Sequence, residues 1–113
     1  MKSNILFTTT PTFDKGYKHL LKKYASLPAD LLRLKDELIE NQEIGISLGG
    51  GIRKIRLAIK SKGKGKSGGV RVISLHLLTN PTNNQIIFSI IYDKSEHQSV
   101  TDDQIRDSLK GII

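Results

Sequence analysis

The sequence predicts an α+β fold, in which a small, largely antiparallel sheet carries a helical hairpin on one face and a short helix follows at the C-terminal end. Three observations predict this class. Apolar residues recur at helical spacing over residues 12–40, they follow strand patterns over residues 52–92, and a helix-capping signal begins at residue 101. The expected order is β-α-α-β-β-β-α. A chain of 113 residues suits one domain, residues 1–113, with one modest core.

The first half of the chain predicts one strand and two amphipathic helices. Residues 4–9, NILFTT, have the β-branched and aromatic content of a strand, which Pro11 ends. We expect Thr12 to cap the first helix, whose apolar stripe is Phe13, Tyr17, Leu20, Leu21 and Tyr24. Pro28 suits the first turn of the second helix, whose stripe is Leu27, Leu31, Leu34 and Leu38. Together they form the helical hairpin, which we expect the segment GISLGGG to close.

From residue 52 the apolar pattern changes to period two. The strand that begins there has an apolar face, with Ile55 and Leu57, and a cationic face, with Lys54 and Arg56. Residues 70–78, VRVISLHLL, predict the next strand, and TNPTNN predicts the turn that ends it.

The last two elements are a buried strand and a capped helix. Residues 85–92, QIIFSIIY, are apolar on both faces, so we expect them to lie inside the sheet. Thr101 and Gln104 have the spacing of a capping box, and Ile105 and Leu109 form the apolar side of the short helix that follows.

Positive charge is concentrated in one part of the chain. Residues 53–71 hold no acid and eight bases, which are Arg53, Lys54, Arg56, Lys60, Lys62, Lys64, Lys66 and Arg71. The rest of the chain carries ten bases and all eleven acids, so the net charge of +7 comes entirely from this stretch. A plain solvated loop is one interpretation of the glycine–lysine segment. The alternative is a surface that attracts polyanions, because the bases continue into the strands on both sides.

Other chemistries find little support. The GKS at 65–67 lacks the earlier glycine of a phosphate-binding P-loop, since Lys60 stands there, and a strand follows rather than a helix. The chain has no cysteine, and His19, His76 and His97 are too dispersed for a metal site. We interpret His19 as exposed and His76 as a packed strand residue, and no cofactor is predicted. The apolar run near the N-terminus is too short for a signal peptide or a membrane span.

The basic residues define a candidate cationic cleft for RNA. Lys54 and Arg56 share one strand face, and Arg71 opens the neighbouring strand. Guanidinium groups suit bidentate phosphate contacts. Alternatively, either arginine pairs with a carboxylate of the last helix. By alternation Arg71 is in phase with Ile73 and Leu75, so it can share a face with Arg56 only at the strand's end or if that strand is apolar on both faces. We expect Arg71 to be exposed.

Three polar residues near the end of the buried strand are candidates for acid–base chemistry. Tyr92, Lys94 and Glu96 share an alternation phase, so we expect them on one side of the chain. A phenol, an amine and a carboxylate can move protons if burial or neighbours tune them.

The run IRKIRLAIKSKGKGKSGGVRVI at residues 52–73, followed by IYDKSE at 91–96, resembles the RelE/ParE superfamily of toxins from bacterial type II toxin–antitoxin systems. It is most similar to the HigB-like branch, and the resemblance covers nearly the whole chain. It implies a small α/β toxin of the cytoplasm that an antitoxin, a small helix-turn-helix protein of the HigA type, holds inactive. It further implies an endoribonuclease that acts on the 70S ribosome, where the 2′-hydroxyl of A-site mRNA attacks the adjacent phosphate.

The resemblance also implies roles for single residues. Lys54 and Arg56 match the basic pair of the family's second strand, Arg71 matches the arginine that opens its third, and Lys94 and Glu96 match the polar cluster after its fourth. With Tyr92 these are the candidate catalytic residues; the candidate RNA- and ribosome-binding residues are Arg53, Lys60, Lys62, Lys64 and Lys66. Ser95 stands where RelE has an arginine, and the last helix lacks RelE's tyrosine, so no general base or acid is named.

Two other functions remain open from the sequence. One is a toxin of the ParE type, which poisons DNA gyrase and cuts no RNA. The other is a plain RNA-binding module, which the scarcity of aromatic residues disfavours because single-stranded bases usually stack on aromatic side chains.

Overall fold

The computed structural model describes residues 4–62, 69–80, 83–97 and 99–112. Lys64 and Lys66 lie outside the described residues. Within them the chain forms three α-helices, five strands and a short 3₁₀ helix. In chain order these are β1 (Asn4–Thr9), α1 (Pro11–Leu21), α2 (Leu27–Glu40), β2 (Ile46–Gly49), β3 (Ile52–Leu57), η1 (Lys60–Lys62), β4 (Val70–Asn80), β5 (Asn83–Asp93) and α3 (Asp102–Leu109).

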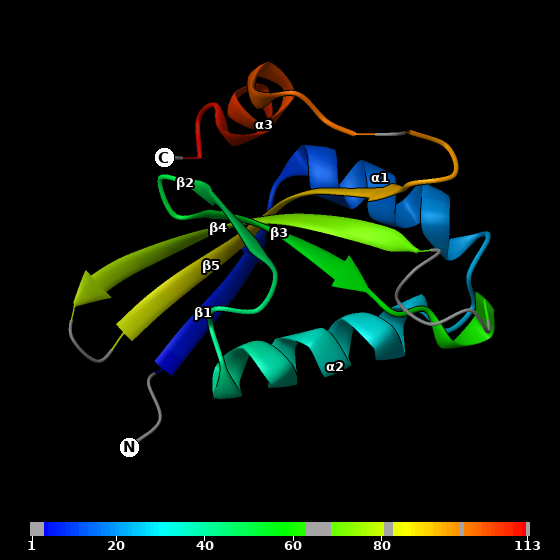
Figure 1. Cartoon of the computed structure of the whole chain (residues 1–113), viewed down its shortest axis with the longest axis horizontal. Helices are drawn as coiled ribbons and strands as arrows, with labels where there is room; N and C mark the ends of the chain where they lie inside the picture. The colour runs from blue at the N-terminus through cyan, green and yellow to red at the C-terminus, as the bar shows by residue number, and fades with distance from the viewer. Residues whose placement is uncertain (1–3, 63–68, 81–82, 98, 113) are drawn as a thin grey trace.

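The strands form one sheet in the order β1-β5-β4-β3-β2. Strand β1 runs parallel to β5, and the other neighbours are antiparallel. Helices α2 and α3 lie on opposite sides of this sheet (Figure 1). The predicted α+β class, with its largely antiparallel sheet, is confirmed.

One strand was missed. The segment GISLGGG does not simply close the hairpin, because its residues 46–49 form β2, the edge strand beside β3. All four residues of β2 are exposed, so no burial pattern marks them in the sequence. The guanidinium of Arg53 orders the preceding segment by donating to the carbonyl oxygens of Glu43, Ile44 and Gly45, at 2.7, 3.0 and 3.0 Å.

The first helix begins two residues earlier than predicted. Thr10, not Thr12, is its N-cap: the Oγ1 of Thr10 accepts from the backbone N–H of Phe13 at 3.0 Å, and Pro11 opens the helix. Proline suits this position because its missing N–H has no helical partner there. The capping box of Thr101 and Gln104 is confirmed for α3.

Apolar side chains fill both faces of the sheet. Helices α1 and α2 cover one face, where Leu20, Leu27, Leu34 and Leu38 are almost fully buried. On the other face, Ile105 and Leu109 of α3 pack with side chains of β4 and β5. These two strands therefore bury both of their faces, as the continuous apolar pattern of β5 predicts.

Gly16 lets α1 approach the sheet closely. A Cβ atom at this position would stand 2.7 Å from the carbonyl oxygen of Ile91, which belongs to the backbone of β5 and cannot easily move. We therefore expect Gly16→Ala to lower the free energy of unfolding by about 1–3 kcal/mol, although alanine by itself favours a helix by about 1 kcal/mol. Urea denaturation measures the change. Lys18→Ala, an exposed substitution in the same helix, is the control, and an equally stable Gly16→Ala protein would contradict the contact.

Candidate nucleic-acid interface

Three predicted site residues lie side by side across the sheet. Arg56 of β3 pairs directly with Arg71 of β4, and Arg71 pairs with Tyr92 of β5. Directly paired residues in antiparallel strands project from the same face. The expectation that Arg56 and Arg71 share a face is confirmed, and both of its conditions hold: Arg71 is the second residue of β4, and the apolar residues of β4 are buried on both faces of the sheet.

These arginines form part of a cleft with four cations. A cavity of about 330 Å³ is lined by Lys54, Arg56, Arg71 and Lys94, together with Ile44, Gly45 and Ile46 from the segment that leads into β2. None of the described residues that line it is an acid, so the charge of this described lining is entirely positive. We call this cavity the cationic cleft.

Arg71 is buried rather than exposed, and that expectation is wrong. Its exposed fraction is 3%, and in the sheet it lies between Arg56 of β3 and Tyr92 of β5. Its Nη1 donates to the carbonyl oxygens of Gly69 and Val70, at 3.0 and 3.5 Å. Within the described residues neither Arg71 nor Arg56 pairs with a carboxylate, and the ion pairs of α3 are internal to its own surface. A buried charge without a counter-charge is costly unless a ligand supplies one.

Lys94 reaches the cleft from a turn that a buried carboxylate organises. Asp93 is fully buried, and its Oδ1 accepts from the N–H and hydroxyl of Ser95, at 2.9 and 2.8 Å. Its Oδ2 accepts from Lys23 at 3.1 Å and from the Tyr24 hydroxyl, two residues that follow the C-terminal end of α1. The backbone N–H of Lys94 also donates to Gly69, the residue whose carbonyl Arg71 holds.

The electrostatics of Asp93 follow from these contacts. Burial raises the pKa of its carboxyl group, but hydrogen bonds from Tyr24, Ser95 and Lys23 outweigh burial, so the pKa lies below its usual value of 3.8. The pKa of Lys23 is raised in turn, chiefly by its hydrogen bond to Asp93. Asp93, Tyr24 and Lys23 were not predicted from the sequence. Only the position of Asp93 at the end of an apolar strand could have drawn attention to it.

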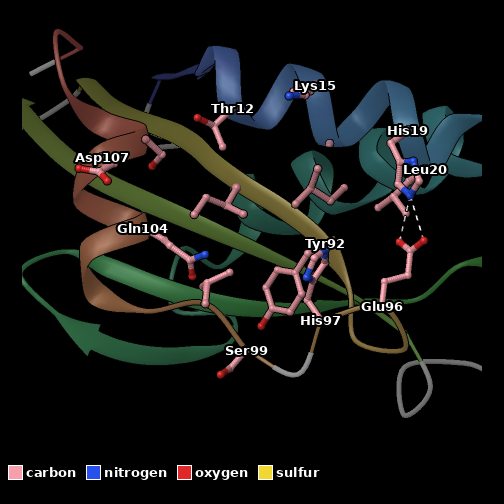
Figure 2. A pocket seen from close by; sticks show the side chains of 15 residues that line it. Thr12, Lys15, His19, Leu20, Tyr92, Glu96, His97, Ser99, Gln104 and Asp107 are labelled. Atoms are coloured by element: carbon pink, nitrogen blue, oxygen red, sulfur yellow. Dashed lines mark hydrogen bonds and ion pairs between the residues drawn. The ribbon is translucent and has the colours of Figure 1, made fainter.

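Tyr92 and Glu96 do not join the cationic cleft. The alternation that was expected to align them with Lys94 stops at Asp93, where the chain turns and the N–H groups of Glu96 and His97 donate to the Asp93 carbonyl. The Glu96 carboxylate instead meets Nε2 of His19 on α1, at 2.9 and 3.2 Å. Tyr92 and Glu96 line a second cavity, of about 560 Å³, between α1 and α3 (Figure 2). We call it the α1–α3 cavity.

The glycine–lysine segment, a loop that follows β3, is attached to α2 at its start. The backbone N–H of Lys60 lies 3.3 Å from the buried carboxylate of Asp30, and the N–H of Ser61 donates to the Ser26 hydroxyl at 2.8 Å, so the start of the loop is attached to the first turn of α2. The side chain of Lys60 is exposed. Lys62 ends η1, and residues 63–68, with Lys64 and Lys66, lie outside the described residues.

The histidines lie away from the cleft. His19 is exposed, as expected, although it contacts Glu96. His76 is half-buried in β4, where Nε2 lies 2.8 Å from the Ser74 hydroxyl, and burial followed by the charge of Arg53 lowers its pKa. This agrees with its interpretation as a packed strand residue. His97 lines the α1–α3 cavity.

The fold and the cleft define a class: a small basic α+β protein with a cationic site on the sheet face that α3 partly covers. A family model described as "RelE toxin of RelE / RelB toxin-antitoxin system" matches residues 14–111, and the chain belongs to this family. It is thus a toxin of a toxin–antitoxin system within the RelE/ParE superfamily, a class that has an antitoxin as partner. No curated protein matches the chain. Among the described helices none is long and apolar enough to cross a membrane.

Proposed function

We propose that this toxin is a ribosome-dependent mRNA endoribonuclease, which acts in the cytoplasm and stops translation by cutting mRNA in the ribosomal A site. The observation that supports this best is the cationic cleft. Lys54, Arg56, Arg71 and Lys94 come from β3, β4 and the turn after β5, and they surround one cavity large enough for a phosphate group. The buried guanidinium of Arg71 has no carboxylate partner in the described part of the chain.

Cleavage by an internal nucleophile requires little more than such a cleft. The 2′-hydroxyl of one nucleotide loses its proton as its oxygen bonds to the adjacent phosphorus, and the 5′-oxygen takes up a proton as its bond to phosphorus breaks, which leaves a 2′,3′-cyclic phosphate and a free 5′-hydroxyl. Negative charge builds on the phosphate oxygens in the transition state. Fixed cations stabilise this charge and hold the phosphate in line for attack.

Within this mechanism we assign binding of the scissile phosphate to Arg56 and Arg71, because one guanidinium group can bind two phosphate oxygens at once. Lys54 and Lys94 add charge at the same cavity, and Lys94 is its amine nearest to the end of β5. Tyr92 and Glu96 face the neighbouring cavity, so any part they take in proton transfer is indirect.

We assign binding of the ribosome to the lysines at positions 60, 62, 64 and 66. Ribosomal RNA is a polyanion, and a run of lysines without acids binds it irrespective of sequence. Arg53, the remaining candidate, has its guanidinium on backbone carbonyls. The antitoxin, for which we propose a small helix-turn-helix protein of the HigA type, would compete for the basic surface with acidic groups of its own.

The proposed function predicts breaks in translated mRNA. After induction of the chain alone in bacterial cells, mapping of mRNA 5′ ends should reveal new ends inside reading frames. A Lys54→Ala, Arg56→Ala double variant should produce fewer by a factor of at least about 100, since the loss of even one charge contact to a transition state reduces the rate about 10²–10³-fold. The matched control is Lys18→Ala, Lys22→Ala, which removes the same number of charges from the exposed side of α1. Intact mRNA accompanied by DNA damage would instead identify a gyrase poison of the ParE type.

A further inference from the structure

We propose that the α1–α3 cavity binds a nucleobase, namely the base of the mRNA nucleotide whose phosphate occupies the cationic cleft. The inference rests on the proposed function, and it extends that function from the phosphate to the base next to it. Four observations support it: the position of the cavity, an unpartnered hydroxyl in its wall, an oriented amide, and the division of charge between the two cavities.

The two cavities are adjacent. Tyr92 lines the α1–α3 cavity and is the direct cross-strand neighbour of Arg71, which lines the cleft. The Cα atoms of directly paired residues lie about 4.5–5.5 Å apart. Lys94 and Glu96, two residues apart in one turn, likewise line different cavities. A phosphate in the cleft therefore places the rest of its nucleotide within reach of the α1–α3 cavity.

The hydroxyl of Tyr92 has no hydrogen-bond partner among the described residues, although the side chain is only 5% exposed. A buried hydroxyl normally finds a partner, because leaving it unpaired costs about 1–3 kcal/mol. A ligand with a polar edge would supply that partner.

Gln104 presents an amide to the same space. Its Oε1 accepts from the backbone N–H of Thr101 at 2.8 Å in the capping box, which fixes the oxygen and leaves the NH₂ group to donate elsewhere. Figure 2 shows the Gln104 side chain extending from α3 toward Tyr92, with His97 beside the tyrosine ring. A hydroxyl and an amide of this kind match the donors and acceptors along the edge of a base.

Charge separates the two parts of a nucleotide. Among the described residues the lining of the cationic cleft includes no acid, whereas the lining of the α1–α3 cavity includes Glu96 and Asp107 together with Lys15, His19 and His97. Glu96 and Asp107 are paired with His19 and Lys110, so the α1–α3 cavity offers a phosphate no excess of positive charge, whereas the cationic cleft does. The apolar part of the wall, formed by Leu20, Ile90, Ile91 and Val100, suits the face of a base. The volume of about 560 Å³ lies within the range of small-ligand sites.

The test begins with binding, which does not require cleavage. The purified protein is titrated with a nucleoside monophosphate and, separately, with inorganic phosphate, while the methyl signals of Ile90 and Val100 are followed by NMR. We expect the nucleotide, but not phosphate, to shift these signals. Tyr92→Phe should weaken nucleotide binding about three- to tenfold, the value of one hydrogen bond, and leave phosphate binding unchanged. Tyr17→Phe removes a hydroxyl outside the cavity and is the matched control. Equal effects of nucleotide and phosphate, or no effect of Tyr92→Phe, would overturn the proposal.

The second part tests whether the base belongs to mRNA. On programmed ribosomes, Tyr92→Phe and Gln104→Ala should reduce the preference for one base beside the cut, measured as the ratio of the cleavage rates for two bases, about three- to tenfold. An unchanged preference in an enzyme that cuts would reject the assignment to mRNA, even if free nucleotide binds. If the wild-type protein cuts no mRNA, the proposed function fails, and the titration alone decides whether the cavity binds a base.

Discussion

Arg71→Ala is expected to reduce ribosome-dependent mRNA cleavage by 10²–10³-fold, which corresponds to about 3–4 kcal/mol for the loss of one preorganised charge contact to the transition state. Arg71 is the residue to substitute first, because it is buried at the cleft wall and its guanidinium has only carbonyl partners among the described residues. Arg71→Lys should recover part of the rate, since lysine keeps the charge but loses the fork. Cleavage of a defined mRNA on purified ribosomes measures each rate.

Burial makes a second variant necessary, because Arg71→Ala also leaves a cavity in the sheet. Arg71→Met fills similar volume without charge, and replacing a buried charge by a well-packed apolar group is often neutral or stabilising. We therefore expect Arg71→Met to unfold at the same temperature as the wild type, or above it, and yet not to cut. Arg106→Ala on the exposed side of α3 is the control. A folded variant that still cuts at the original rate would remove Arg71 from the mechanism and leave Lys54, Arg56 and Lys94 to be tested.

Asp93→Ala is expected to lower the free energy of unfolding by about 2–4 kcal/mol, because it leaves the buried Tyr24 hydroxyl and the Ser95 N–H without their acceptor. The turn that carries Lys94 should loosen as well. Chemical denaturation at neutral pH measures the change. The control is Asp107→Ala, which removes an exposed carboxylate of α3. Equal stability of Asp93→Ala and wild type would show that the carboxylate does not hold the turn.

The same carboxylate predicts a dependence of stability on pH. The pKa of Asp93 is lower in the folded protein than its unfolded value of about 3.8, so the unfolded chain binds a proton first as the pH falls. Its stabilisation is complete well above pH 3.8 and is lost as the pH falls below that value. Asp93→Asn lacks this titration. The difference in stability between wild type and Asp93→Asn should therefore be largest at neutral pH and shrink in acid; a constant difference would contradict the lowered pKa.

The sequence predicted most of the fold because its apolar periodicity is strong where elements are buried. With the exception of Leu21, which is exposed although it was predicted in the apolar stripe, the stripes of the first two helical segments mark side chains that pack in the core, and so does the continuous run of β5. Strand β2 gave no such signal, since its four residues are exposed and its order comes from Arg53 and the pairing with β3. The Thr10 cap was missed because Thr12 offers the same chemistry two residues later.

The positions of the candidate site residues could be predicted within strands, where side chains alternate between the two faces of the sheet. They could not be predicted beyond the strand ends, where this alternation stops. Lys54 and Arg56 were placed correctly because they lie within β3, and Arg71 follows from the pairing of β3 with β4. The burial of Arg71 depends on tertiary packing that no local pattern records. The separation of Glu96 from Lys94 depends on the turn at Asp93, whose carbonyl accepts from two successive N–H groups.

The parallel pairing of β1 with β5 has a consequence for the order in which the protein forms. Asn4 pairs with Asn83, which follows it by 79 positions, so an edge of the sheet joins two segments that are far apart in the chain. Contacts between segments so distant in sequence form slowly, because the entropy of closing the intervening loop must be overcome first. The cationic cleft also forms late, because Lys94, one of the residues that line it, follows β5 in the chain. During translation the nascent chain therefore cannot complete the sheet before β5 has been added, nor the cationic cleft before Lys94 has been added, so the surface that we propose to bind RNA does not exist while the preceding 93 residues are being made.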